Sequence, residues 1–167
     1  ELGRACARAL VALNFDVAGW ARRPHEVPGV ACHAGEAGLD AALAGADIAV
    51  LLLPDTPATR CVLNARTLAL LAPGAVVINP GRGPLIDDDA LLAALDAGRL
   101  SHATLDVFRT EPLPPDHPFW AHPRVTVTPH VASATRPESA AQLIAENIAR
   151  GEAGRPLRHI VDRAAGY

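Results

Sequence analysis

Three side chains in the second half of the sequence have types suited to binding a carboxylate and transferring a proton: Arg82, Glu111 and His130. Arg82 lies between two glycines, and a guanidinium group held by such a turn can bind a carboxylate through two hydrogen bonds. His130 carries an imidazole, which exchanges a proton near neutral pH, and Glu111 lies within loop reach of it. The simpler interpretations are a surface arginine, a surface charge and a structural histidine.

Two arginines, Arg22 and Arg23, follow an apolar stretch where a dinucleotide-binding protein usually carries an acidic residue for the ribose 2'-hydroxyl of NAD. Guanidinium groups pair with phosphate oxygens, so these arginines favour the 2'-phosphate of NADPH, with NADH as the alternative cofactor. A solvated basic turn is the other interpretation of the same residues.

Further cofactor candidates follow other apolar stretches. The turn that begins at Leu53 and Pro54 reaches Thr59, whose hydroxyl could bond a cofactor phosphate or ribose. A plain turn closed by a Ser/Thr hydrogen bond explains Thr59 equally well. Asp106 closes a later apolar run and could hold a carboxamide or a backbone group, while Gly3 would fit the last glycine of a GxGxxG turn. The alternatives are a helix cap or surface charge for Asp106 and a packing or capping glycine for Gly3.

The pattern of apolar residues predicts the elements that position these side chains. Runs without polar alternation predict buried strands at residues 17–20, 30–32, 46–53, 75–78, 103–107 and 125–127. Helical spacing predicts helices over residues 2–13, 39–43, 67–71 and 87–97. Strands that alternate with helices imply an α/β fold, a doubly wound parallel sheet with its ligand at the carboxyl ends of the strands.

The two ends of the sequence carry separate expectations. The chain enters its first helix with no strand before it, so we expect the first strand of the fold, and the first two glycines of its loop, to be missing. A last helix is expected to begin near Thr135, because Thr135 and Glu138 have the spacing of a capping box, and to run to Gly151. The residues after Gly154 show no pattern.

Composition limits the class of protein. The chain has 167 residues, half of them hydrophobic, and a formal net charge of −3, which favours one compact domain. The basic residues, all of them arginines, are scattered along the chain, so we expect a small-molecule ligand and neither nucleic acid nor membrane as a partner. The apolar runs are too short to cross a bilayer, and three widely spaced cysteines favour reduced thiols in a cytoplasmic protein without a metal site.

Three segments together resemble the D-isomer-specific 2-hydroxyacid dehydrogenase family in their order and spacing. They are residues 79–83 (Asn-Pro-Gly-Arg-Gly), residues 106–113 (Asp-Val-Phe, then Glu-Pro-Leu) and residues 128–130 (Thr-Pro-His). The resemblance implies that Arg82 binds the carboxylate and carbonyl of a 2-oxo acid. It also implies that His130 donates a proton to the carbonyl oxygen and that Glu111 bonds to His130, which favours the protonated imidazole.

The same resemblance implies a Rossmann-like dinucleotide-binding domain over residues 1–150 and a tail, 151–167, on the side of a substrate domain that is absent. Asp106 would hold the nicotinamide carboxamide and Arg22 and Arg23 the 2'-phosphate, with Thr59 and Ser133 as further cofactor contacts. The implied activity is NADPH-dependent reduction of glyoxylate or hydroxypyruvate in a homodimer. A D-lactate or phosphoglycerate type of dehydrogenase and a non-catalytic, NAD(P)-sensing binding module are the alternatives.

Overall fold

A computed structural model describes residues 1–163 of the chain, so the last four residues of the predicted tail lie outside the described residues. The chain divides into two compact units, Glu1–His130 and Val131–Tyr167. The composition had instead favoured one domain. The last helix therefore falls in the second unit, whereas the predicted domain over residues 1–150 grouped it with the sheet. The functional boundary at residue 150 stays a prediction.

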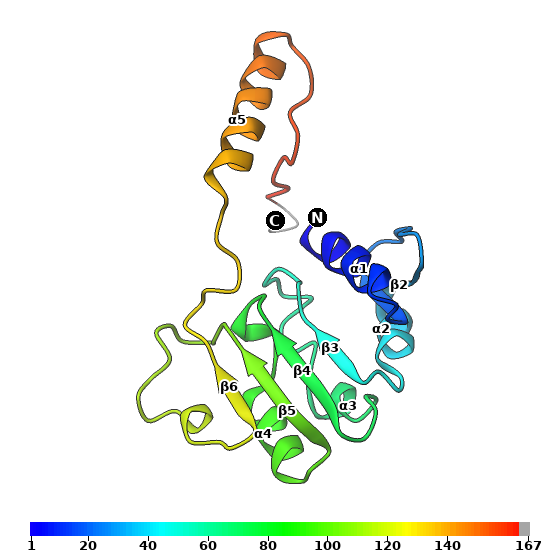
Figure 1. Cartoon of the computed structure of the whole chain (residues 1–167), viewed down its shortest axis with the longest axis vertical. Helices are drawn as coiled ribbons and strands as arrows, with labels where there is room; N and C mark the ends of the chain where they lie inside the picture. Colours follow the sequence, from blue (N-terminus) through cyan, green and yellow to red (C-terminus); the bar gives the residue numbers. More distant parts are fainter. Residues whose placement is uncertain (164–167) are drawn as a thin grey trace. The chain divides into compact units, whose positions relative to one another are not determined.

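The first unit contains six parallel strands, which confirms the predicted α/β fold with a parallel sheet. Strands β3 (Ile48–Val50), β4 (Ala75–Asn79), β5 (Leu100–Leu105) and β6 (Val125–Val127) pair side by side in that order (Figure 1). Strands β1 (Val17–Ala21) and β2 (Val30–Ala34) form a separate two-stranded sheet. The carboxyl ends of β3 to β6 therefore lie along one edge, where a doubly wound fold binds its ligand.

The division into two sheets has a simple topological reason. In the strand order 3-2-1-4-5-6 of a dinucleotide-binding fold, the strand that precedes the first helix lies in the middle of the sheet. The described residues contain no strand before α1 (Leu2–Ala12), and among them no ladder of hydrogen bonds joins β1 to β3. In that order, β1 and β2 belong to one side of the central strand position, and β3 to β6 belong to the other.

The helices of the first unit begin where local capping groups favour them. Helix α3 (Ala65–Leu68) begins earlier than the predicted 67–71, because Asn64 accepts hydrogen bonds from the amides of Arg66 and Thr67 and forms a capping box with Thr67. Helix α4 (Asp88–Asp96) closely matches the prediction, and Asp87 accepts from the Ala90 amide as its N-cap. Helix α2 extends over Gly35–Leu43.

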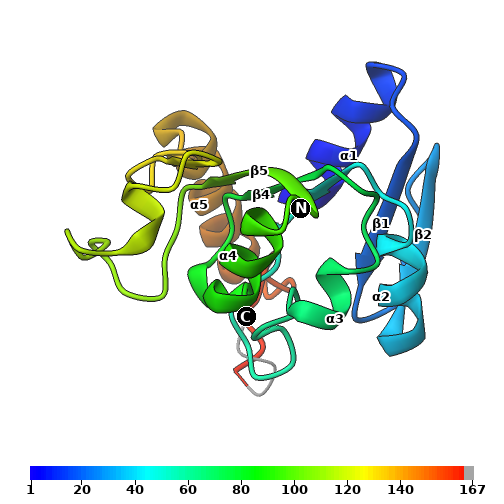
Figure 2. The ribbon, with the colours of Figure 1, turned by 90° about the horizontal axis from the view of Figure 1, so that it is seen from below.

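One side of the four-stranded sheet carries the core of the first unit. Helices α3 and α4 lie on that side, and α1 lies on the opposite side, where it packs against β1 (Figure 2). The residues sealed between β4, β5 and the two helices are aliphatic: Leu68, Leu71, Val77, Leu91, Leu95 and Leu100. This packed layer fixes β4 and β5, so the loops that follow their carboxyl ends start from rigid positions.

The second unit is built on helix α5 (Pro137–Glu152). The predicted capping box at Thr135 was wrong: the helix begins at Pro137, and its N-cap, Arg136, makes no side-chain cap bond. Proline disfavours helical geometry in the residue before it, and Arg136 is accordingly extended, with φ −80° and ψ 115°. The tail is more ordered than its sequence suggested, because the Arg158 amide donates to Asn147 Oδ1 at 2.9 Å.

In the part of the chain that the structure describes, no helix is both long and apolar enough to cross a membrane.

Candidate active site

The structure brings together two of the three residues expected to do the chemistry. His130 follows β6, Glu111 lies in the loop after β5, and His130 Nδ1 is 2.8 Å from Glu111 Oε2. Both side chains reach solvent, at 51% exposure for His130 and 37% for Glu111, so a small substrate has access to the pair. The predicted contact between Glu111 and His130 is therefore present.

The second carboxylate oxygen of Glu111 is held by the protein backbone. The Phe108 amide donates to Glu111 Oε1 at 2.9 Å, and this bond is the main reason why the pKa of Glu111 is lowered. His130 and the positive charge of Arg82 lower the pKa further, against an opposing effect of burial. An ionised carboxylate only accepts hydrogen bonds, so His130 Nδ1 is the donor and Nε2 is the ring nitrogen left to face a substrate.

Arg82 lies in the loop after β4 and is exposed. A buried residue, Asn79, shapes this loop: its side-chain amide donates to the Arg82 carbonyl at 2.9 Å, and its Oδ1 accepts from the Gly81 amide at 3.1 Å. The Arg82 guanidinium donates to the Gly81 carbonyl at 2.6 Å. Arg82 is close enough for its charge to lower the pKa of Glu111. The site thus combines an exposed arginine with a histidine–carboxylate pair.

Gly83 explains how the Arg82 loop and the Glu111 loop can lie against each other. A Cβ atom at Gly83 would lie 1.9 Å from the carbonyl carbon of Phe108 and 2.2 Å from its oxygen. Only glycine can occupy this position without moving one of the two loops. The backbone contact between Gly83 and Phe108 therefore sets the spacing between the two loops.

Asp106 is buried at the carboxyl end of β5, with 3% exposure. Its Oδ1 accepts a hydrogen bond from Thr128 Oγ1 at 2.5 Å, and its amide donates to the Asn79 carbonyl at 3.0 Å. The sequence pointed to Asp106, but it did not single out Thr128 and Asn79. Both belong to the segments 79–83 and 128–130 that carried the resemblance, so their position beside Arg82 and His130 was the available signal.

The remaining cofactor candidates occupy different surroundings. Arg22 and Arg23 are exposed directly after β1, as a phosphate contact requires. Thr59 is buried, and its hydroxyl donates to the Pro54 carbonyl at 2.6 Å, which is the turn-closing role left open as the alternative. The Leu53–Pro54 turn follows β3 at the ligand edge of the sheet.

Gly3 and Ser133 are the two remaining candidates, and both are exposed. Gly3 lies inside α1 and is exposed, and an added Cβ atom would meet nothing within 4 Å, so neither packing nor strain requires glycine there. Ser133 belongs to the second unit and is exposed. The cofactor roles of both residues stay predictions.

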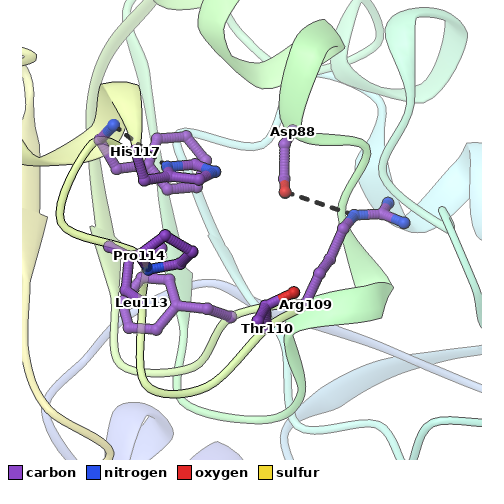
Figure 3. Close-up of a pocket in the computed structure, with 8 residues that line it drawn as sticks. Asp88, Arg109, Thr110, Leu113, Pro114 and His117 are labelled. Atoms are coloured by element: carbon purple, nitrogen blue, oxygen red, sulfur yellow. Dashed lines mark hydrogen bonds and ion pairs between the residues drawn. The ribbon is translucent and has the colours of Figure 1, made fainter.

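A cavity of about 190 Å³ lies beside the loop that carries Glu111 (Figure 3). Arg109 and Asp88 line one side of it and form an ion pair, with 3.4 Å between Arg109 Nε and Asp88 Oδ2. Burial raises the pKa of Asp88, and the charge of Arg109 opposes this. Arg109 also donates to the Ile86 carbonyl and to Cys61 Sγ, so it fastens the loop to the segment before α4. None of Arg82, Glu111 and His130 lines this cavity.

Among the described residues, no group of three or more His, Cys, Asp or Glu side chains is placed to hold a metal ion.

The fold and the site define a class of protein. Residues 1–132 match the sequence profile of the NAD-binding domain of D-isomer specific 2-hydroxyacid dehydrogenases. The chain therefore belongs to the D-isomer specific 2-hydroxyacid dehydrogenase family, as its motifs suggested.

Within the family, similar proteins include reductases of small 2-oxo acids. Glyoxylate/hydroxypyruvate reductase A from Serratia proteamaculans is 48% identical over 99% of this chain and 53% of that protein. The protein of the same name from Yersinia enterocolitica is 44% identical, over the same shares of the two chains. The chain spans about half the length of these curated relatives.

Two solved structures of relatives superpose closely on the chain. A D-isomer specific 2-hydroxyacid dehydrogenase from Xanthobacter autotrophicus Py2, in complex with NADPH and MES, is 50% identical with a TM-score of 0.93, over 99% of this chain and 69% of that one. An NADPH-dependent glyoxylate/hydroxypyruvate reductase from Sinorhizobium meliloti, with NADP and sulfate, is 44% identical with a TM-score of 0.92, over 99% and 54%.

Proposed function

We propose that the protein reduces a small 2-oxo acid, glyoxylate or hydroxypyruvate, to the 2-hydroxy acid with NADPH. The observation that carries the proposal is the pair of His130 and Glu111, joined at 2.8 Å, beside the loop of Arg82. A 2-oxo acid offers a carboxylate and a neighbouring carbonyl, which match a guanidinium and a proton donor. The Serratia and Sinorhizobium relatives support the choice of substrate class.

Each residue has a defined part in this reaction. Arg82 binds the substrate carboxylate and turns the carbonyl oxygen toward His130. Hydride arrival makes that oxygen an alkoxide, and protonated His130 supplies its proton from Nε2. Glu111 holds the imidazole through Nδ1 and balances its positive charge, and the Phe108 amide keeps the carboxylate in place. The pair thus fixes the orientation of the imidazole for this proton transfer.

The donor set of the chain fits a phosphorylated dinucleotide. Two exposed guanidinium groups, of Arg22 and Arg23, follow β1, and guanidinium pairs with phosphate through paired hydrogen bonds. Asp106, at the end of β5, is the acceptor proposed for a carboxamide. When bound, the nicotinamide supplies the hydride. The NADPH and NADP complexes of the Xanthobacter and Sinorhizobium relatives support this choice of cofactor.

The test is a steady-state assay of the protein expressed from its own gene. NADPH oxidation is followed with glyoxylate and hydroxypyruvate, and with pyruvate and phosphohydroxypyruvate for comparison. We expect the first two substrates to give the highest kcat/KM, and His130→Gln to lower kcat/KM roughly 100-fold or more without changing NADPH affinity. A preference for pyruvate or phosphohydroxypyruvate would identify another dehydrogenase of the family. NADPH binding without turnover of any substrate would identify a binding module.

A further inference from the structure

The carboxyl ends of β4, β5 and β6 are joined by one network of hydrogen bonds, in which Asn79 and Asp106 are buried. The Asp106 amide donates to the Asn79 carbonyl at 3.0 Å, and the Thr128 hydroxyl donates to Asp106 Oδ1 at 2.5 Å. At one end of the network Asn79 bonds the Arg82 loop, and at the other the His130 amide donates to the Thr128 carbonyl at 3.1 Å. The network therefore runs from the backbone of Arg82 to the backbone of His130.

We propose that Thr128 and Asn79 are positioning residues of the reductase site, Thr128 through its bond to Asp106 and Asn79 through its bonds to the Arg82 loop. Thr128 fixes the turn that presents His130 to Glu111, and Asn79 fixes the turn that presents Arg82 to the substrate. The inference rests on the proposed function, because it assigns the two residues to the reaction stated there. Neither residue touches the reacting atoms in this assignment.

His130 needs such support because its backbone is in an unfavourable conformation. Its φ is 54°, in the left-handed region that residues other than glycine rarely adopt. A conformation of this kind persists only when the surroundings hold it. Thr128, two residues earlier, makes two bonds to the end of β5: its amide to the Leu105 carbonyl at 3.0 Å, and its hydroxyl to Asp106. The turn to His130 thus starts from a doubly anchored residue.

Asn79 supports Arg82 in the same way. The residue has 1% exposure and its side chain uses both ends, donating to the Arg82 carbonyl at 2.9 Å and accepting from the Gly81 amide at 3.1 Å. A buried amide that bonds two successive residues of one loop fixes the conformation of that loop. Misplacement of a catalytic group by about 1 Å is enough to cost roughly 100-fold in rate, so both anchors matter for turnover.

The experiment compares two substitutions of Thr128. Thr128→Val keeps the shape and removes the hydroxyl, whereas Thr128→Ser keeps the hydroxyl. Because His130 acts only in the transition state, we expect Thr128→Val to lower kcat and kcat/KM together, by about tenfold or more, with little change in KM for glyoxylate. Thr128→Ser should recover most of the loss. A folded Thr128→Val protein with kcat within about twofold of the parent, or an equal loss in the serine variant, overturns the proposal.

Asn79→Asp is the second variant, and it decides the question if Thr128→Val does not fold. It keeps the acceptor for the Gly81 amide and removes the donor to the Arg82 carbonyl. Because Arg82 binds the substrate carboxylate before and during the reaction, we expect the KM for glyoxylate to rise about tenfold, with a smaller change in kcat. An unchanged KM in a folded Asn79→Asp protein overturns the assignment of Asn79.

Crystal structures of the same variants separate this proposal from the proposed function. The parent protein's failure to reduce any 2-oxo acid would reject the function alone. The positioning role still predicts that Thr128→Val moves His130 Nδ1 beyond hydrogen-bonding distance of Glu111, and that Thr128→Ser does not. An intact pair in the valine variant overturns the positioning role whatever the activity.

Discussion

Among the single residues of the site, Glu111 is the one whose ionisation the surrounding groups stabilise. The Phe108 amide, His130 and Arg82 lower its pKa, so the ionised form is more stable in the folded chain than in the unfolded one. A lowered pKa gives stability that is present above the unfolded-state value and lost as pH falls through the folded-state value. Protonation of Glu111 at low pH should therefore lower the stability of the fold and remove a charge from the candidate active site.

We therefore predict a pH-dependent effect of Glu111→Gln on stability. At neutral pH the variant should unfold more easily than the parent, by no more than about 1 kcal/mol, because the contact between Glu111 and His130 is partly exposed. The difference should vanish below the lowered pKa of Glu111, where the parent carboxyl is protonated and resembles the amide. Urea unfolding at neutral and at acid pH measures this. A difference that is independent of pH would assign the effect to packing.

The two arginines after β1 give a prediction about cofactor choice. Replacing Arg22 and Arg23 by alanine removes the groups proposed to bind the 2'-phosphate, which NADH lacks. We expect the Kd for NADPH to rise roughly 10-fold to 100-fold, corresponding to the loss of charge-assisted hydrogen bonds, with little change in the Kd for NADH. Fluorescence titration with both cofactors tests this. Equal losses for the two would show that the arginines do not recognise the 2'-phosphate.

At the scale of elements, the contact between the loops after β4 and β5 decides whether the site forms. Gly83→Ala places a Cβ atom 1.9 Å from the Phe108 carbonyl carbon, and the backbone on both sides has to move. We expect a loss of stability at the upper end of the roughly 1–3 kcal/mol seen for overpacking. Turnover should fall as well, because Arg82 and Glu111 move apart.

Gly151→Ala is the matched control for this prediction. Gly151 lies within α5, and an added Cβ would meet only Leu157 Cδ2, at 3.8 Å. Alanine in a helix is more favourable than glycine by about 0.5–1 kcal/mol, so this variant should be as stable as the parent or slightly more so. Thermal unfolding of both variants measures the contrast. Similar losses in the two would mean that the Gly83 contact is not specific.

For the whole molecule, the two units differ in how many of their side chains are buried. The first unit has a sealed aliphatic core around β4, β5 and α4, whereas no residue of α5 is buried, and Ile144 and Ile148 are 61% and 58% exposed. Amide hydrogens in buried, packed elements exchange only by larger unfolding events than those in exposed helices. The free energy of local unfolding should therefore be higher in the first unit than in the second.

Hydrogen exchange measured by mass spectrometry tests this difference. We expect amides of β4, β5 and α4 to exchange far more slowly than those of α5 in the same sample. The short helix α3, whose Leu68 is buried, serves as an internal control, because its protection should follow burial rather than length. Exchange in α5 as slow as in β4 would mean that α5 is held by a partner surface in solution.

The order of strands and helices, and the placement of Arg82, Glu111 and His130 after strands, could be predicted from the sequence. These features depend on local patterns, because the alternation of apolar runs identifies strands and a parallel sheet places the residues after them at one edge. The start of α5 was misjudged because the effect of Pro137 on Arg136 outweighed the capping pattern at Thr135.

The side chains that support the candidate site could be identified only in the folded chain. The bond from Thr128 to Asp106 joins residues that follow two different strands, and the contact of Gly83 with Phe108 joins two loops far apart in the sequence. No local pattern encodes such pairings, because they depend on strand register and on how closely two backbones approach. The division into two sheets is likewise decided by which strands share hydrogen bonds. Sequence pattern thus pointed to the candidate site residues, and long-range packing determined their geometry.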